Sequence, residues 1–119
     1  MKTKLILLSL IILFLYSCAS APKAMYYYGK YSHTLYEYKK AGSVEQLQIH
    51  IDELHKIITT SNKKKLRVPP GIYAELGFYY SQKENFDNAI KYYKLESSTY
   101  PESTKFMATL IDNTILMKE

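Results

Sequence analysis

The side chains best suited to metal chemistry in this sequence are its three histidines, His33, His50 and His55. His50 and His55 enclose Asp52 in a His-x-Asp-x-x-His segment, and imidazole and carboxylate groups are ligands of divalent metals. On a helix, however, a spacing of five residues turns two side chains about 140° apart, so one helix cannot bring both histidines to one ion. We therefore interpret His50 and His55 as boundary residues of an amphipathic helix and expect no metal site.

The acidic side chains do not suggest catalysis either. Asp52 with Glu53, and Glu84 with Asp87, stand where helix surfaces and turns are expected. Catalysis by two carboxylates needs a buried and converging pair. The four glycines are scattered rather than gathered into a phosphate-binding loop. We predict that the protein is not an enzyme and has neither catalytic residues nor a cofactor.

The single cysteine follows a segment that is typical of a secretory signal. Two lysines precede an apolar run over residues 5–15, and Leu-Tyr-Ser then leads into Cys18. A basic start, a short apolar core and a small residue before the cleavage point define such a signal. The Leu-x-Ser-Cys ending resembles the lipobox of bacterial lipoproteins. This resemblance implies removal of residues 1–17 and acylation of Cys18. The alternatives are an uncleaved anchor and an ordinary signal with a stray thiol.

Lipidation at Cys18 would make residues 18–27 a membrane tether, because two or more acyl chains anchor a protein stably. It would also leave no thiol for disulfides or for cysteine catalysis. Removal of the two signal lysines lowers the formal net charge from +5 to +3. One basic cluster remains, Lys63-Lys64-Lys65 with Arg67, which could meet anionic lipid headgroups or an acidic partner, or simply be solvated. We expect no nucleic-acid partner for an exported, lipid-anchored chain.

Residues 70–103 carry a second strong pattern. Aromatic and small residues recur there at spacings of three and four, as one face of a helix requires, and a proline closes the segment. The pattern resembles the tetratricopeptide repeat, which implies two antiparallel helices nested through small residues. Glu96 departs from it, because that family usually has a small residue there. The matching residues are Tyr73, Leu76, Gly77, Tyr80, Ala89, Tyr93 and Pro101.

One repeat cannot bury its apolar face alone, so the flanking segments should supply further helices. Tyr31, Leu35 and Tyr38 predict a helix within residues 28–40. Ser43 and Gln46 resemble a capping box that opens a long amphipathic helix to about residue 60.

Residues 62–70 form a polar linker to the repeat. After Pro101, Ser103 can cap a last helix with Phe106, Leu110 and Met117 near one face. We predict an all-α domain over residues 28–119. Its five helices would form two helix-turn-helix units and a capping helix, in a short right-handed tetratricopeptide-like stack.

The chain has 13 tyrosines, more than helix packing requires. Tyrosine is favoured where one end of a side chain is buried and the other is wet, as at protein interfaces and membrane surfaces. We predict a partner surface that includes Tyr27 and Tyr36 of the first helix pair and Tyr79 and Tyr92 of the second. The latter two could line the groove that such stacks present to extended peptides. Compositional drift and a membrane-proximal collar are the alternatives.

As a whole, the chain resembles a family of small bacterial lipoproteins of unknown function with a tetratricopeptide-like domain, the DUF4810-like proteins. The lipobox, the segment Tyr28-Gly29-Lys30-Tyr31 and the Leu-Gly-x-x-Tyr repeat carry this resemblance. It implies other envelope lipoproteins as companions, including one similar to the curli-export channel subunit. Ala19 after the cysteine fits release to the outer membrane.

These observations lead to two functional hypotheses. The first is a lipid-anchored envelope scaffold or adaptor, on the periplasmic face of the outer membrane, that binds another envelope protein. The second is a lipoprotein that binds a glycan or a small molecule, with tyrosines stacked on sugar rings.

Overall fold

The structure is a computed structural model that describes residues 1, 2, 4, 6 and 22–119. Cys18 and nearly all of the predicted signal segment therefore lie outside the described residues, and their assignment remains a prediction. In the part of the chain that is described, no helix combines the length and hydropathy needed to cross a membrane.

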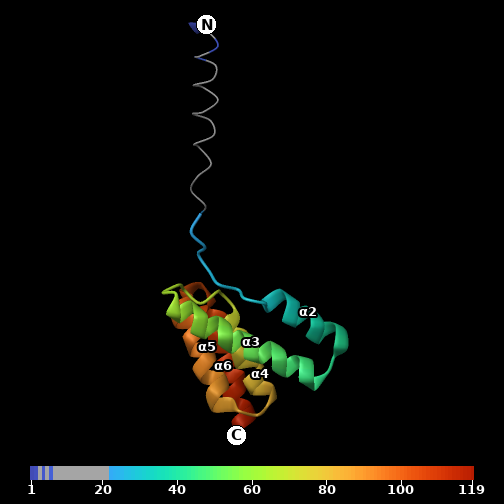
Figure 1. The fold of residues 1–119 in the computed structure, drawn as a ribbon. Helices are drawn as coiled ribbons and strands as arrows, with labels where there is room; N and C mark the ends of the chain where they lie inside the picture. The colour runs from blue at the N-terminus through green and yellow to red at the C-terminus, as the bar shows by residue number, and fades with distance from the viewer. Residues whose placement is uncertain (3, 5, 7–21) are drawn as a thin grey trace.

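Residues 22–119 fold into five α-helices, which confirms the predicted all-α class (Figure 1). Helix α3 runs three residues beyond its predicted end. A short 3₁₀ turn, η2 (Pro101–Ser103), separates the last two helices. The α-helices are α2 (Tyr31–Ala41), α3 (Val44–Lys63), α4 (Ile72–Gln82), α5 (Phe86–Thr99) and α6 (Thr104–Lys118).

Local sequence signals set several helix ends. The Ser43 side chain accepts a hydrogen bond from the backbone N–H of Gln46 at 3.2 Å, so the predicted cap of α3 is confirmed. Asn85 caps α5 in the same way, through the N–H of Asn88. Gly42 ends α2 in the left-handed conformation, with φ of 61°, and its N–H donates to the carbonyl of Tyr38.

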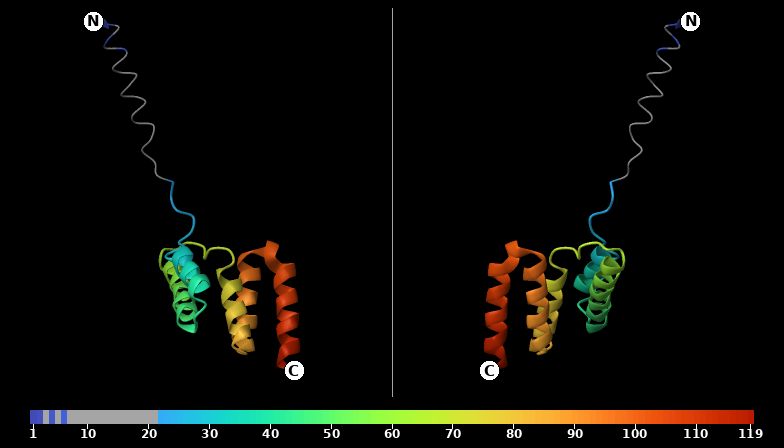
Figure 2. Two further views of the ribbon diagram at one scale, coloured as in Figure 1. Left: turned by 90° about the vertical axis from the view of Figure 1, so that its right-hand side faces the viewer. Right: turned by 90° about the vertical axis from the view of Figure 1, so that its left-hand side faces the viewer.

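The helices run alternately up and down and form two hairpins and an added helix (Figure 2). Helix α2 packs on α3, α4 packs on α5, and α6 packs on the outer side of α5. Helices α2, α4 and α6 therefore begin at one end of the stack. The turns between α2 and α3 and between α4 and α5 lie at the other end, together with the C-terminus.

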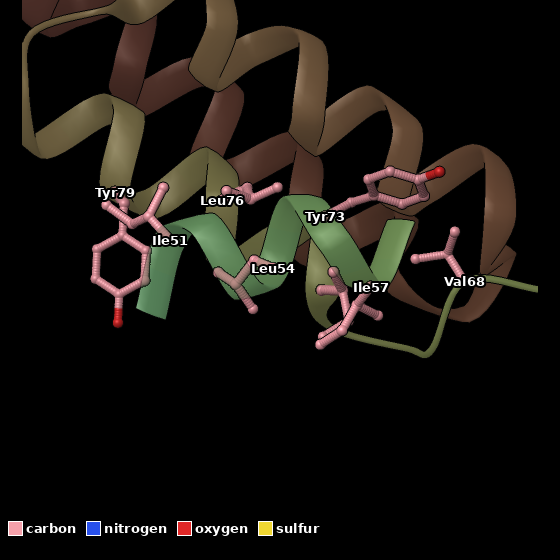
Figure 3. Packing of buried hydrophobic residues seen from close by; sticks show 8 residues of the cluster. Ile51, Leu54, Ile57, Val68, Tyr73, Leu76 and Tyr79 are labelled. Carbon is pink, nitrogen blue, oxygen red and sulfur yellow. The ribbon is translucent and has the colours of Figure 1, made fainter. Parts of the chain in front are cut away.

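The larger part of the core lies between α3, α4 and the segment that joins them (Figure 3). Leu54 and Ile57 of α3 are fully buried, and so is Leu76 of α4. A smaller cluster of Ala89, Tyr93 and Met107 joins α5 to α6. Burial of such side chains is the main favourable contribution to folding in a domain without disulfides.

Gly77 lets the two helices of the second hairpin approach closely. A β-carbon at this position would lie 2.5 Å from Cε1 of Tyr93 and 3.1 Å from the backbone carbonyl oxygen of Ala89. A glycine in a helix interior costs about 1 kcal/mol relative to alanine. The close contact with α5 explains why a glycine is nevertheless found at this position.

Buried carboxylates cap the first helix of each hairpin. Glu53 of α3 accepts a hydrogen bond from the N–H of Lys30 at 2.7 Å, just before α2 begins. Glu96 of α5 accepts one from the N–H of Gly71 at 2.8 Å and a longer one from Ala74, at the start of α4. Anionic groups are stabilised at helix N-termini. Glu96, which departs from the repeat pattern, is therefore a cap contributed by the partner helix.

The last helix differs from the prediction in two respects. Ser103 does not cap α6: it belongs to the 3₁₀ turn, and its hydroxyl donates to the carbonyl of Tyr100 at 2.7 Å. Phe106 and Met117 are 63 % and 65 % exposed, whereas Met107 and Thr114 are buried. Helix α6 begins at Thr104, directly after the turn, and buries Met107 and Thr114 rather than the two ends of the predicted stripe.

Candidate functional site

A buried polar network joins the two helix pairs. Nδ1 of His50 lies 2.8 Å from the hydroxyl of Thr34, and its Nε2 lies 3.1 Å from Oε1 of Glu75. The hydroxyls of Tyr31 and Tyr79 also donate to Glu75, at 2.9 and 3.2 Å. Helices α2, α3 and α4 are thus connected through one carboxylate. His50 is completely buried, so its predicted place at the edge of an amphipathic helix is wrong.

The network holds Glu75 in its ionised form. Burial alone would raise the pKa of Glu75, but the hydrogen bonds from His50, Tyr31 and Tyr79 outweigh it and the pKa is lowered. Burial, followed by the hydrogen bond to Glu75, raises the pKa of Tyr31 to about 12. Burial also raises the pKa of Tyr79. Both phenols are therefore hydrogen-bond donors at neutral pH.

Thr34, His50 and Glu75 place a hydroxyl, an imidazole and a carboxylate in series, as in a catalytic nucleophile with its base and acid. Thr34, however, is only 6 % exposed, and its hydroxyl also lies 3.1 Å from the carbonyl oxygen of Tyr31. A nucleophile needs access to its substrate as well as a base. We therefore assign the network to the stability and relative placement of the three helices.

A second cluster is aromatic and lies where α3 meets α4 and α5. The rings of Tyr80 and Tyr92 stack with centroids 5.4 Å apart, and the ring of Tyr73 also stacks on Tyr92, with centroids 6.3 Å apart. His55 meets Tyr80 and Tyr92 edge-on, and its Nε2 lies 3.3 Å from the Tyr80 hydroxyl. Burial lowers the pKa of His55 while Asp52 opposes this, so the imidazole is neutral at pH 7.

Beside this cluster a cavity of about 280 Å³ opens between α3 and α4. Tyr79, Tyr80 and Ile51 form its apolar wall. Its polar groups are linked, because Lys83 donates to Gln48 at 3.1 Å and Gln48 donates to Asp52 at 2.9 Å. His55 completes the lining. The cavity lies toward the end of the stack where α4 turns into α5.

This arrangement is suited to recognition. An apolar or aromatic group can enter against the tyrosines, while an acid and a base of opposite charge at the rim bind its polar substituents. Across the described part of the chain, no group of three or more His, Cys, Asp or Glu side chains is placed to hold a metal ion.

The structure places the four predicted partner-binding tyrosines in different surroundings. Tyr36 is 61 % exposed, with the Lys40 ammonium 5.8 Å from its ring centroid. Tyr27 and Tyr92 are half-buried. Tyr79 is only 6 % exposed, and it forms a cavity wall and part of the polar network. The exposed aromatic of α4 is its neighbour Phe78, at 50 %.

The repeat residues lie mostly in the core. Tyr73, Leu76, Ala89 and Tyr93 are buried, and Tyr80 is half-buried. Sequence analysis missed Glu75, Gln48 and Lys83 as members of a site. Only a contact between helices that are distant in the sequence brings them together, and no local pattern reveals it.

The fold and the cavity define a class, that of short helix-hairpin stacks with a cavity between neighbouring hairpins. The chain belongs to the family described as Domain of unknown function (DUF4810), whose model matches residues 25–110. Neither the search of curated proteins nor the search of solved structures found a match.

Proposed function

We propose that this protein is a membrane-tethered adaptor of the cell envelope. In this proposal the N-terminal segment is processed before Cys18 and the cysteine is acylated, with palmitate among the acyl groups. The protein is then held at the periplasmic face of the outer membrane. The domain matched by the family begins at residue 25, a few residues after the proposed anchor. The helical stack would bind a second envelope protein.

The observation that carries the proposal is the cavity between α3 and α4. It combines a tyrosine wall with Asp52 and Lys83 at its rim, and it lies toward the end of the stack opposite the exit of the N-terminal segment. Aromatic anchors surrounded by polar groups are typical of protein interfaces. A domain tethered at one end and open at the other can hold a partner away from the membrane.

The nearby exposed aromatics extend this surface. Phe78 of α4 is half exposed and its ring lies 5.8 Å from that of Tyr79, which forms the cavity wall. Helical stacks use such faces to hold extended segments of other proteins. The family resemblance makes a component similar to the curli-export channel subunit the first partner to look for.

The test is a pull-down of the tagged full-length protein from detergent-solubilised envelope, with bound proteins identified by mass spectrometry. Asp52→Lys and Lys83→Glu each reverse one charge of the cavity rim on an exposed residue, so the fold should survive. Lys94→Glu, on the exposed surface of α5, is the matched control. We expect one dominant partner that both rim variants lose and the control retains. A partner retained equally by all variants, or no partner above background, would contradict the proposal.

A glycan or small-molecule ligand is the second candidate, and the size of the cavity favours it. About 280 Å³ is close to the lower limit of small-ligand sites, roughly 300 Å³. Tyr80 can stack on a sugar ring, while Gln48, Asp52 and Lys83 bind hydroxyl or acetamido groups. Co-sedimentation with purified cell wall tests this candidate. Cell-wall binding that Asp52→Lys abolishes would favour a glycan over a protein partner.

A further inference from the structure

The N-terminal segment leaves the helical domain at one particular end of the stack. Residues 22–30 lead into α2 where α3 ends, where α4 begins and where α5 passes into α6 (Figures 1 and 2). This is the end opposite to the C-terminus.

Contacts with the domain fix the direction of this exit. The Lys64 ammonium lies 4.7 Å from the ring centroid of Tyr27. Burial, followed by the neighbouring Tyr26 hydroxyl, raises the pKa of Tyr100, whose own hydroxyl donates to the carbonyl of Val68 at 2.6 Å. The N–H of Lys30 is bound by Glu53. The chain from Tyr26 to Lys30 is thus packed against this end of the stack.

The same end carries a dense group of positive charges, which we call the basic end. It consists of Lys30, Lys63, Lys64, Lys65 and Arg67, all exposed. The guanidinium of Arg67 lies 4.2 Å from the ring centroid of Tyr100 and donates to the carbonyl of Thr99, so its charge is held in place.

Few negative charges oppose the basic end. Glu102 is the exposed acid in the neighbouring 3₁₀ turn. The carboxylates of Glu53 and Glu96 are buried against helix N-termini, whose positive dipole ends offset their charge. The opposite end of the stack is mixed in sign, as in the ion pair of Lys118 with Asp87 at 2.7 Å. The positive charge is therefore concentrated where the chain leaves toward its N-terminus.

We propose that the basic end is a docking surface for the anionic headgroups of a lipid bilayer. The proposal rests on the proposed function for the tether, because a chain of eight residues from Cys18 to Tyr26 spans at most about 29 Å. An anchor at Cys18 thus keeps the basic end near the bilayer and raises its effective concentration there. Basic residues beside an anchor are attracted to anionic lipid within about a Debye length, roughly 8–10 Å. The stack then stands with its cavity facing away from the membrane.

The test measures how fast each lysine of the full-length protein reacts with a membrane-impermeant amine reagent at low conversion. The protein is mixed with vesicles of phosphatidylcholine alone or with vesicles that also contain phosphatidylglycerol. We expect phosphatidylglycerol to slow modification of Lys63, Lys64 and Lys65 by about threefold or more, and high salt to remove the effect. Lys39 and Lys40, in the last turn of α2 at the opposite end of the stack, should react equally with both. The proposal would be overturned if phosphatidylglycerol protected every lysine equally, or if it protected no lysine.

Charge-reversal variants then test the residues. In Lys63→Glu/Lys64→Glu/Lys65→Glu, phosphatidylglycerol should no longer protect Lys30. The control Lys39→Glu/Lys40→Glu/Lys118→Glu has the same charge change at the opposite end of the stack and should keep this protection. The corresponding triple glutamine variant serves if the glutamates prevent folding. Washing membranes that contain the protein with carbonate tests the anchor separately, because the wash releases proteins that are held only by charge. Protein released by the wash would contradict the lipid tether of the proposed function. The modification rates with added vesicles would still decide whether the basic end binds anionic lipid.

Discussion

Replacing Gly77 by alanine tests whether the close approach of α4 and α5 holds the second hairpin together. The added β-carbon would lie 2.5 Å from Cε1 of Tyr93, well inside the normal contact distance of two carbon atoms. Tyr93 is only 2 % exposed, so its ring cannot swing into solvent. Either the two helices separate or the ring leaves its preferred rotamer.

Two opposing effects decide the change in the free energy of unfolding. Alanine is favoured over glycine in a helix interior by about 1 kcal/mol. Overpacking a close-packed core costs about 1–3 kcal/mol, and so short a contact with a pinned ring lies at the upper end of that range. We expect Gly77→Ala to lose about 2 kcal/mol net, which lowers Tm by about 10 °C in a domain of this size.

Thermal and urea unfolding, followed by circular dichroism, measure this loss. Ala108→Gly, on the exposed side of α6, measures the stability difference between alanine and glycine in a helix without any overpacking. This variant should lose about 1 kcal/mol in the free energy of unfolding. Tyr93→Leu removes the ring that the new methyl group meets, so Gly77→Ala/Tyr93→Leu should lose less than the sum of the single variants. A Gly77→Ala protein that is more stable than the wild type by the propensity difference would refute the reasoning.

Three further predictions concern the polar groups and the other glycines. Glu75→Ala leaves Nε2 of fully buried His50 without its partner and should cost about 2–3 kcal/mol in urea unfolding. Wild-type stability would show that the bond to Glu75 contributes nothing. Because folding lowers the pKa of His55, the unfolded chain binds a proton at this histidine first as the pH falls, and the free energy of unfolding should decline below about pH 6.5. His55→Gln should flatten this decline, and an unchanged slope would exclude His55 as its cause. Gly29 and Gly42 both have positive φ, but a β-carbon at Gly29 collides with a buried carboxylate and one at Gly42 meets nothing within 4 Å. Gly42→Ala should therefore cost about 1 kcal/mol and Gly29→Ala clearly more in the same unfolding assay, and equal losses would contradict this.

Much of the fold could be predicted because its determinants are local. The stripe from Leu47 to Ile58 has the period of a helix, and Ser43 with Gln46 marks where that helix begins. The spacing of Leu76, Gly77 and Ala89 predicts two nested helices, because only small residues allow such an approach. Local signals fail at α6, where packing against α5 and not the spacing alone selects Met107 for the core.

The candidate site could not be predicted because its contacts join distant parts of the chain. Tyr31 and Glu75 are 44 residues apart, and His50 lies between them. A histidine on a helix looks like a boundary residue until its partners on two other helices are known. The burial of Tyr79 could not be predicted for the same reason. It stands off the repeat positions and is nevertheless buried, because α2 covers it in the stack.

The two hairpins are related more closely by their caps than by the repeat pattern. Each first helix follows a glycine with positive φ, and each second helix returns a buried glutamate to that helix start. Glu53 comes 24 residues after Gly29, and Glu96 comes 25 residues after Gly71. A carboxylate from a partner helix can satisfy free N–H groups only if the two helices have a fixed length and register. The residue that departs from the tetratricopeptide pattern in the second hairpin is therefore the counterpart of a residue in the first. The first hairpin, which matches that pattern only weakly, is built by the same rule.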